Sequence, residues 1–367
     1  MPKNKNPFLL NPELIQFLKD YINTPSPVGS ESGGQRVWLN YIKNIVDETF
    51  TDPYGTAVGV INPGKPFKVV IEAHADEISW FVNYINPDGF IYLKRNGGTD
   101  PIIAPSQRVI IHGNKGPVKA VFGWPAIHTR MGRDDKEYQP KMENLFLDCG
   151  ARCLGEVEKL GIHVGSLVTH VDTFDELAFD NFIARAFDNR IGGFMNAQVA
   201  RHLKSNKKSL PYSLYIVNSV QEEIGLRGAE MIARRIKPDV AIVTDVTHDT
   251  GTPLINKQIE GECKCGKGPV LTFGPAVHNK LLQFIEKTAV KNKIDYQLHA
   301  VSRSTGTDTE SFAYANDGCP SALISIPLRY MHTTVEMIHR ADIEKTIQLM
   351  YESVLALSPK TNLSYFE

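Results

Sequence analysis

Residues 213–225 read Ser-Leu-Tyr-Ile-Val-Asn-Ser-Val-Gln-Glu-Glu-Ile-Gly. The apolar, β-branched first half predicts a buried strand, and the second half delivers Glu222 and Glu223 to a glycine turn. Adjacent side chains on an extended segment point in opposite directions, so the two carboxylates can do different jobs at one centre. An isolated Glu-Glu pair could equally do no more than solvate the mouth of a loop. The rest of the sequence has to decide between these interpretations.

Three more apolar runs each lead to an acid or a histidine: residues 67–72 precede His74 and Asp76, residues 239–244 precede Asp245, and residues 321–326 precede His332. Near-continuous Val/Ile/Leu runs that alternate with helical patterns are typical of a parallel sheet covered on both faces. Ligands of such sheets bind beyond the carboxyl ends of the strands. We therefore expect these polar side chains, which are far apart in the sequence, to meet in one crevice.

The composition limits the class of protein. A chain of 367 residues with 42% hydrophobic residues is globular and long enough for two domains. The formal net charge of −1 does not favour nucleic acid as a partner, and no apolar window is long enough to span a membrane. The start lacks the apolar core of a signal peptide, and five cysteines without repeated pairs indicate reduced thiols. These features predict a cytoplasmic protein.

The pattern along the chain predicts two domains. Residues 1–76 and 175–367 carry helical patterns and strands, and we expect them to form an α/β domain with a mixed, largely parallel sheet. Between them, in residues 77–174, helical periodicity nearly disappears and short β-type runs are separated by glycines, which predicts an inserted small β-barrel-like domain. This insert should contain one helix over residues 151–160, and the polar residues 132–141 predict a surface loop.

Five carboxylates and two imidazoles are expected in the crevice, namely His74, Asp76, Asp188, Glu222, Glu223, Asp245 and His332. Asp188 belongs to this set because it precedes a helical pattern and should lie in a strand-to-helix turn. So many ionised groups would repel one another and lose hydration, and divalent cations are the natural compensation. Three carboxylate ligands, Asp188, Glu223 and Asp245, balance two dications that share one hydroxide. A mixed histidine and carboxylate shell suits zinc, with cobalt or manganese as alternatives.

Two acids of this set remain outside the ligands. Asp76 lies two residues after His74, where a carboxylate can orient the imidazole of a ligand histidine. Glu222 is then free to act as a general base. His332 competes with His339 as the histidine of the last strand, and we favour His332 because it follows the apolar run directly.

A set of motifs now points to a family: residues 73–77 (AHADE), 123–128 (GWPAIH), 145–150 (LFLDCG), 187–190 (FDNR), 221–229 (QEEIGLRGA), 244–246 (TDV), 306–308 (GTD) and 326–332 (IPLRYMH). With these motifs in this order, the chain resembles the dinuclear-metal aminopeptidases of the tetrahedral, glutamyl/leucyl type, some of which have been labelled endoglucanases. The resemblance covers nearly the whole chain. It implies the zinc-exopeptidase type of fold and a metal-dependent aminopeptidase that acts on short peptides.

The resemblance also implies roles for individual residues. Asp188 would bridge two metal ions, with His74 and Asp245 completing one site and Glu223 and His332 the other. Glu222 falls on the catalytic base, acting on a water that the two metals bridge, and Asp76 falls on the partner of His74. The inserted β-rich region would be a dimerisation domain, and dimers would assemble into a dodecamer.

Some features remain open. Thr307, Asp308 and Arg329 are candidates for the substrate pocket, although Thr307 and Asp308 could merely form a turn. The sequence departs from the family pattern at Thr333 and Thr334 and over residues 247–262, which leaves the preferred N-terminal residue open. Two alternative functions are a dimetal amidohydrolase that acts on acylated amino acids and a non-catalytic oligomeric scaffold that binds peptides.

Overall fold

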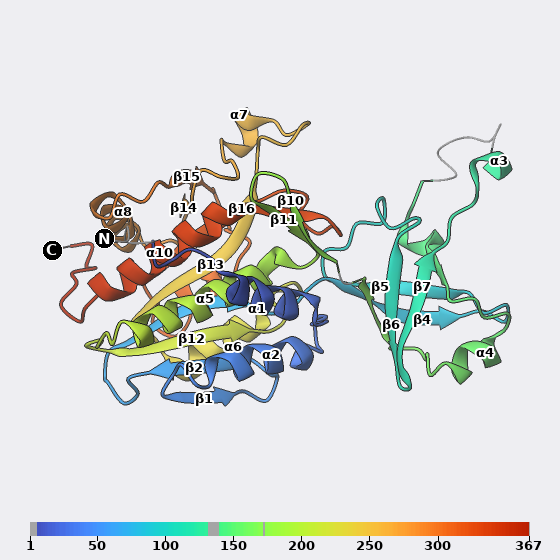
Figure 1. Ribbon diagram of the computed structural model, residues 1–367, viewed down its shortest axis with the longest axis horizontal. Helices are drawn as coiled ribbons and strands as arrows, with labels where there is room; N and C mark the ends of the chain where they lie inside the picture. The colour runs from blue at the N-terminus through green and yellow to red at the C-terminus, as the bar shows by residue number, and fades with distance from the viewer. Residues whose placement is uncertain (1–5, 131–138, 172, 367) are drawn as a thin grey trace.

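The computed structural model describes residues 6–130, 139–171 and 173–366. Its largest element is an eight-stranded mixed sheet, in which β12, β3, β13 and β16 are parallel neighbours and antiparallel or edge strands extend both sides (Figure 1). In spatial order the strands are β1 (Glu48–Thr51), β2 (Ala57–Ile61), β12 (Ser213–Ser219), β3 (Lys68–His74), β13 (Val240–His248), β16 (Ser321–Leu328), β14 (Val270–Phe273) and β15 (Gln297–Ala300).

The central strands are buried on both faces, as their continuous apolar sequences predict. The longest buried helix, α5, packs against β3, β12 and β13 and is itself covered by α1, α2 and α10, while α6 and α9 pack together against the same part of the sheet. The helices of this domain are α1 (Pro12–Asn23), α2 (Ser32–Ile42), α5 (Phe187–Ser205), α6 (Arg227–Ile236), α7 (Lys257–Glu260), α8 (Asn279–Lys291), α9 (Thr309–Ala313) and α10 (Arg340–Ala356).

A closed six-stranded barrel is inserted between β3 and the rest of the α/β chain and lies to one side of it (Figure 1). Trp80, Phe122 and Val168 are among the side chains that fill its separate core. Its elements are β4 (Ser79–Ile85), β5 (Ile91–Asn96), β6 (Arg108–Gly113), β7 (Gly116–Phe122), α3 (Ile127–Arg130), η2 (Met142–Asn144), β8 (Phe146–Asp148), α4 (Leu154–Lys159) and β9 (Leu167–His170).

A small three-stranded antiparallel sheet follows the barrel, in the order β10 (Phe174–Leu177), β11 (Asn181–Ala184) and β17 (Glu336–His339). Its register pairs Ala184, just before α5, with Glu336, just after the last long strand. This small sheet therefore brings the chain around Asp188 next to the chain around His332.

The predicted fold class is confirmed: a large mixed sheet flanked by helices, with an inserted barrel. The helix expected over residues 151–160 is present but shorter, as α4. Most of the predicted surface loop over residues 132–141 lies outside the described residues. Within the described part of the chain, no helix is both long and apolar enough to cross a membrane. The five cysteines are free.

Candidate metal centre

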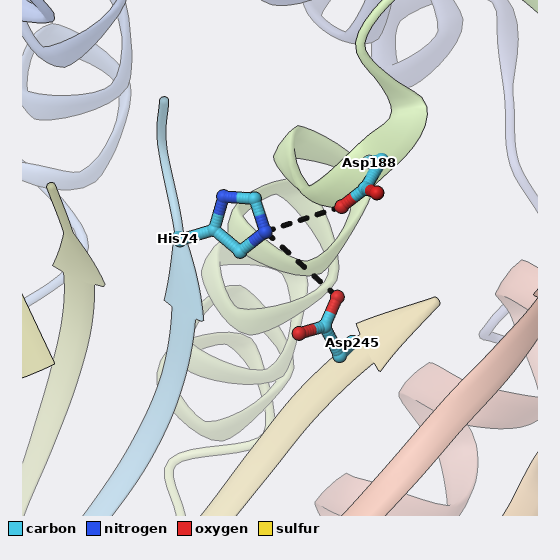
Figure 2. Close-up of side chains that lie close together, drawn as sticks. All are labelled: His74, Asp188 and Asp245. Atoms are coloured by element: carbon cyan, nitrogen blue, oxygen red, sulfur yellow. Dashed lines mark hydrogen bonds and ion pairs between the residues drawn. The ribbon is translucent and has the colours of Figure 1, made fainter. Parts of the chain in front are cut away.

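The polar side chains predicted to meet do lie together at the carboxyl edge of the large sheet. His74 is the last residue of β3, Asp245 lies in the second half of β13, and Glu222 and Glu223 follow β12. Asp188 lies at the start of α5, where its own backbone is not yet helical, as expected for a strand-to-helix turn. Figure 2 shows the side chains of His74, Asp188 and Asp245 converging from these three elements.

Two groups of three donors share the carboxylate of Asp188. His74, Asp188 and Asp245 form one group, and Asp188, Glu223 and His332 form the other, with the ligand atoms of each group within 4.8 Å of one another. Oδ1 of Asp188 lies 3.1 Å from Nε2 of His74, whereas Oδ2 lies 3.2 Å from Nε2 of His332. The two oxygens of one carboxylate thus face different histidines, which is the arrangement that a bridging ligand requires.

The second group is closed by Glu223, whose Oε1 lies 3.3 Å from Nε2 of His332. In the first group, Oδ1 of Asp245 lies 3.9 Å from Nε2 of His74. The rival histidine, His339, instead accepts a hydrogen bond from the backbone N–H of Ala341 at the start of α10. Of the two histidines, His332 is the one that faces the carboxylates.

The electrostatics of these groups fit bound cations. Burial raises the pKa of Glu223, and it raises the pKa of Asp245 well above its usual value. Burial alone would lower the pKa of His74 and His332, but the surrounding carboxylates outweigh it, raising the pKa of His332 to about 11 and that of His74 well above its usual range. In the absence of metal, protons must therefore supply the positive charge that the acids need. Nitrogen and carboxylate oxygen donors in groups of this size suit zinc, cobalt or manganese.

Asp76 does more than the sequence suggested. Its Oδ1 lies 3.4 Å from Nδ1 of His74, an ion-pair distance that is long for a hydrogen bond. The same carboxylate accepts the backbone N–H of Glu222 at 3.0 Å through Oδ1 and that of Glu223 at 3.1 Å through Oδ2. Asp76 is fully buried and therefore fixes the turn that carries both glutamates as well as facing the histidine.

Glu336 has the matching position on the other side of the centre, and no pattern in the sequence selects it. Its Oε2 accepts the backbone N–H of Asp188 at 3.0 Å, and its Oε1 accepts that of His332 at 2.8 Å. Burial raises the pKa of Glu336 to about 8. The pairing of its strand with the chain before α5 brings Glu336 to the centre, and no local sequence pattern reveals that pairing.

The linker between β5 and β6 contacts the centre through Gly98. Its carbonyl oxygen lies 3.1 Å from Nδ1 of His332, so a proton on Nδ1 leaves Nε2 free to bind a metal. A Cβ atom at Gly98 would lie 2.7 Å from ring atoms of His332, so a larger residue at this position would displace the ring. One turn of the inserted region thus holds a candidate ligand of the other domain.

A cleft of about 580 Å³ opens over the two donor groups. Glu222 lines this cleft, with Oε2 3.8 Å from Nε2 of His74, and belongs to neither donor group. Burial raises the pKa of Glu222 to about 10, and the charge of His74 opposes this shift. Because Glu222 lines the cleft, its carboxyl group borders the space in which a substrate would bind.

The three substrate-pocket candidates have different surroundings. Thr307 lines the cleft. Asp308 is buried and its Oδ2 accepts a hydrogen bond from the hydroxyl of Ser219, while Nε of Arg329 donates to Asp249 at 2.7 Å. Neither Asp308 nor Arg329 is among the residues that line the cleft, and contact of either with substrate stays a prediction.

Comparison with known proteins adds independent information. Residues 55–349 match the family model described as M42 glutamyl aminopeptidase. A lysyl aminopeptidase of Pyrococcus furiosus is 32% identical over 94% of this chain and 97% of its own length. A TET aminopeptidase from a marine sediment archaeon, Thaumarchaeota archaeon SCGC AB-539-E09, is 28% identical, with a TM-score of 0.90 over 96% of this chain and 99% of its own.

A more distant structure shares the fold. The TET1 peptidase of Pyrococcus horikoshii, which can assemble into a tetrahedron or a large octahedral shell, is 24% identical. Its TM-score is 0.82 over 92% of this chain and 98% of its own.

Proposed function

Since this chain belongs to the M42 glutamyl aminopeptidase family and is a hydrolase of peptide bonds, we propose that it removes N-terminal residues from short peptides at a centre of two divalent metal ions. The observation that carries this proposal is the pair of donor groups that share Asp188, with Glu222 facing the cleft above them. The number of metals, their identity and the role of each residue are part of the proposal.

In this proposal one metal is held by His74, Asp188 and Asp245, and the other by Asp188, Glu223 and His332. Zinc is the expected ion, with cobalt or manganese as alternatives. When bound, such a pair of cations lowers the pKa of a water molecule and stabilises negative charge on a carbonyl oxygen.

Glu222 is proposed as the general base. It takes a proton from the attacking water and returns it to the departing amine, a role typically worth roughly 10²–10⁴-fold in rate. Asp76 and Glu336 act through other residues, because they hold the backbone of Glu222, Glu223, Asp188 and His332 in place. The free α-amine of the substrate is expected to be required, which distinguishes an aminopeptidase from an enzyme that acts on acylated amino acids.

The test combines metal content with a substrate panel. The purified protein is analysed for bound metal before and after chelation, and its turnover of aminoacyl-p-nitroanilides is compared with that of their N-acetylated counterparts. Metal-dependent turnover of the free-amine substrates supports the proposal. Turnover confined to the acetylated forms would favour the amidohydrolase, and no turnover of either by the metal-loaded protein would favour a binding scaffold.

We further propose that the chain is a cytoplasmic homo-oligomer, with a dimer as the basic unit, its barrel as the dimerisation domain and a dodecamer as the larger assembly. Exposed apolar side chains on the barrel, including Ile102 and Val164, support a covered surface there. The assemblies described for the structurally similar peptidase support the larger particle. Light scattering coupled to gel filtration measures the state, and a monomer at micromolar concentration would contradict the proposal.

A further inference from the structure

One wall of the cleft is a single loop. Residues 304–307 all line the cleft, and they belong to the connection between β15 and α9. This connection has no regular secondary structure, so side-chain hydrogen bonds largely decide where it lies relative to the metal centre.

Glu310 folds the loop onto the first turn of α9. Its Oε1 accepts the backbone N–H of Thr305 and its Oε2 accepts the hydroxyl of the same residue, both at 2.6 Å. The hydroxyls of Thr305 and Thr307 lie 2.8 Å apart, and that of Thr309 lies 2.9 Å from that of Thr307. The loop and α9 therefore form one unit, and the groups that attach this unit to the sheet also place the wall of the cleft.

Asp308, at the start of α9, attaches the unit to the central strands. Its Oδ2 lies 2.8 Å from Oγ of Ser219, the last residue of β12, and this hydroxyl lies 2.5 Å from Oε1 of Glu72 on β3. All three side chains are buried. In the sheet, Ser219 pairs in register with the candidate ligand His74. The attachment therefore lies beside the metal centre and below the cleft wall.

A second attachment of the unit is weaker. Oγ of Ser311 on α9 donates to the carbonyl oxygen of Leu226, another residue that lines the cleft, at 3.2 Å. Both groups are neutral and Ser311 is only half-buried, so this bond contributes less than a buried bond to a carboxyl group. Of the two attachments, the one through Asp308 is the stronger.

We propose that Asp308 is a positioning residue that, through the hydroxyl of Ser219, holds residues 304–307 in the place that a peptide substrate requires. This inference rests on the proposed aminopeptidase function. Without the attachment, the loop would spend less time in its native position, and substrate affinity falls in proportion to that fraction. Neither Asp308 nor Ser219 belongs to the two donor groups, so the binding of metal should not depend on them.

The first experiment measures kcat and KM for leucyl-p-nitroanilide, together with metal content. Asp308→Ala removes the carboxyl group, and Ser219→Ala removes the hydroxyl that it bonds. Each should raise KM by roughly 10- to 100-fold, the effect of losing a hydrogen bond to a charged group, with kcat and metal content close to native. The double variant should resemble either single variant, because both changes remove the same bond.

Asp308→Asn separates positioning from direct contact with the substrate. An asparagine can still bond the hydroxyl of Ser219 through its amide oxygen or its N–H group, so it should restore most of the native KM. A KM as high as that of Asp308→Ala would show that the negative charge itself is needed and would overturn the inference.

Asp342→Ala is a matched control. Asp342 is also a buried aspartate in the first turn of a helix, and its carboxylate accepts the backbone N–H groups of Gly266 and Gly268, which do not line the cleft. This variant should lower the free energy of unfolding and keep the native KM. If Asp308→Ala does not fold, Ser219→Ala, which removes a single hydroxyl, decides alone. An unchanged KM in folded Ser219→Ala protein would overturn the inference and leave the aminopeptidase function intact.

Limited proteolysis tests the position of the loop without relying on turnover. Arg303 is exposed and directly precedes the lining residues, so trypsin can cut after it once the loop leaves its native position. Mass spectrometry should find this cut roughly 10-fold faster in Asp308→Ala and Ser219→Ala than in the native protein or in Asp342→Ala. If the metal-loaded native protein turned over no substrate, the proposed function would fail, and this measurement would still decide the inference. Cutting at the native rate in both alanine variants would overturn it.

Discussion

Replacing Asp76 by asparagine tests how much the candidate centre depends on a residue that holds no metal in the proposed arrangement. The carboxylate of Asp76 accepts the backbone N–H groups of Glu222 and Glu223 through its two oxygens and faces His74 through one of them. An asparagine side chain has the same size but a single acceptor oxygen. Whichever way the amide is turned, its NH₂ group must face one of the two backbone N–H donors.

The magnitude follows from these contacts. A hydrogen bond to a charged acceptor contributes about 1.5–3 kcal/mol, and a buried N–H left without an acceptor costs a similar amount. At about 1.4 kcal/mol per factor of ten, the displaced turn should weaken metal binding by roughly 10- to 100-fold. This range agrees with the loss that is typical when a group supporting a metal ligand is removed.

Metal affinity is measured by competition with a chelator of known affinity, alongside kcat/KM and the free energy of unfolding. Asp52→Asn is a control for the substitution itself, because Oδ1 of Asp52 alone accepts the backbone N–H groups of Tyr54 and Thr56, in a turn outside the metal centre. The control should leave metal affinity unchanged. An Asp76→Asn protein that binds metal as tightly as the native protein, with unchanged kcat/KM, would refute the reasoning.

Three further changes test other parts of the molecule. Glu222→Gln should keep both metals, as measured by elemental analysis, and lower kcat by roughly 10²–10⁴-fold; native turnover would remove Glu222 from its assigned role. Gly98→Ala places a Cβ atom 2.7 Å from the ring of His332, so metal content should fall, and full occupancy would contradict the role of Gly98. Burial, with the charge of Arg201, lowers the pKa of His202 from its usual 6.5 to about 4. Because the unfolded chain then takes up a proton first, stability should fall as the pH drops from about 7 to about 4, by up to about 3 kcal/mol. His202→Phe should reduce this loss in denaturant unfolding at pH 7.5 and 5, and an identical pH dependence in both proteins would exclude His202 as its source.

The sequence could predict the strands and the residues at their ends because both depend on local patterns. Buried parallel strands have continuous apolar sequences, and the residue that follows each of them must lie at one edge of the sheet. For that reason the sequence alone predicts that His74, Glu223 and Asp245 share a crevice. The individual metal assignments came from the family resemblance and remain proposals.

Two of the supporting residues, Glu336 and Gly98, could not be predicted, and the reason is physical. Glu336 and Gly98 act on the backbone or ring of His332, and these contacts depend on the pairing of β11 with β17 and on the path of the linker after β5. Such contacts leave no periodic pattern in the sequence. The partners of Asp308 and Arg329, namely Ser219 and Asp249, are likewise far away in the chain and fixed by tertiary packing.

Because the carbonyl of Gly98 lies at hydrogen-bonding distance from the ring of His332, deleting the inserted region would affect the candidate metal centre. A shortened protein in which residues 77–174 are replaced by a brief connector would keep every side chain assigned to the cations. It would nevertheless lose the group that orients one of those imidazoles. The appended barrel and the hydrolytic machinery are therefore a single functional unit, and a minimal enzyme cut from this chain must carry the turn at Gly97 and Gly98 with it.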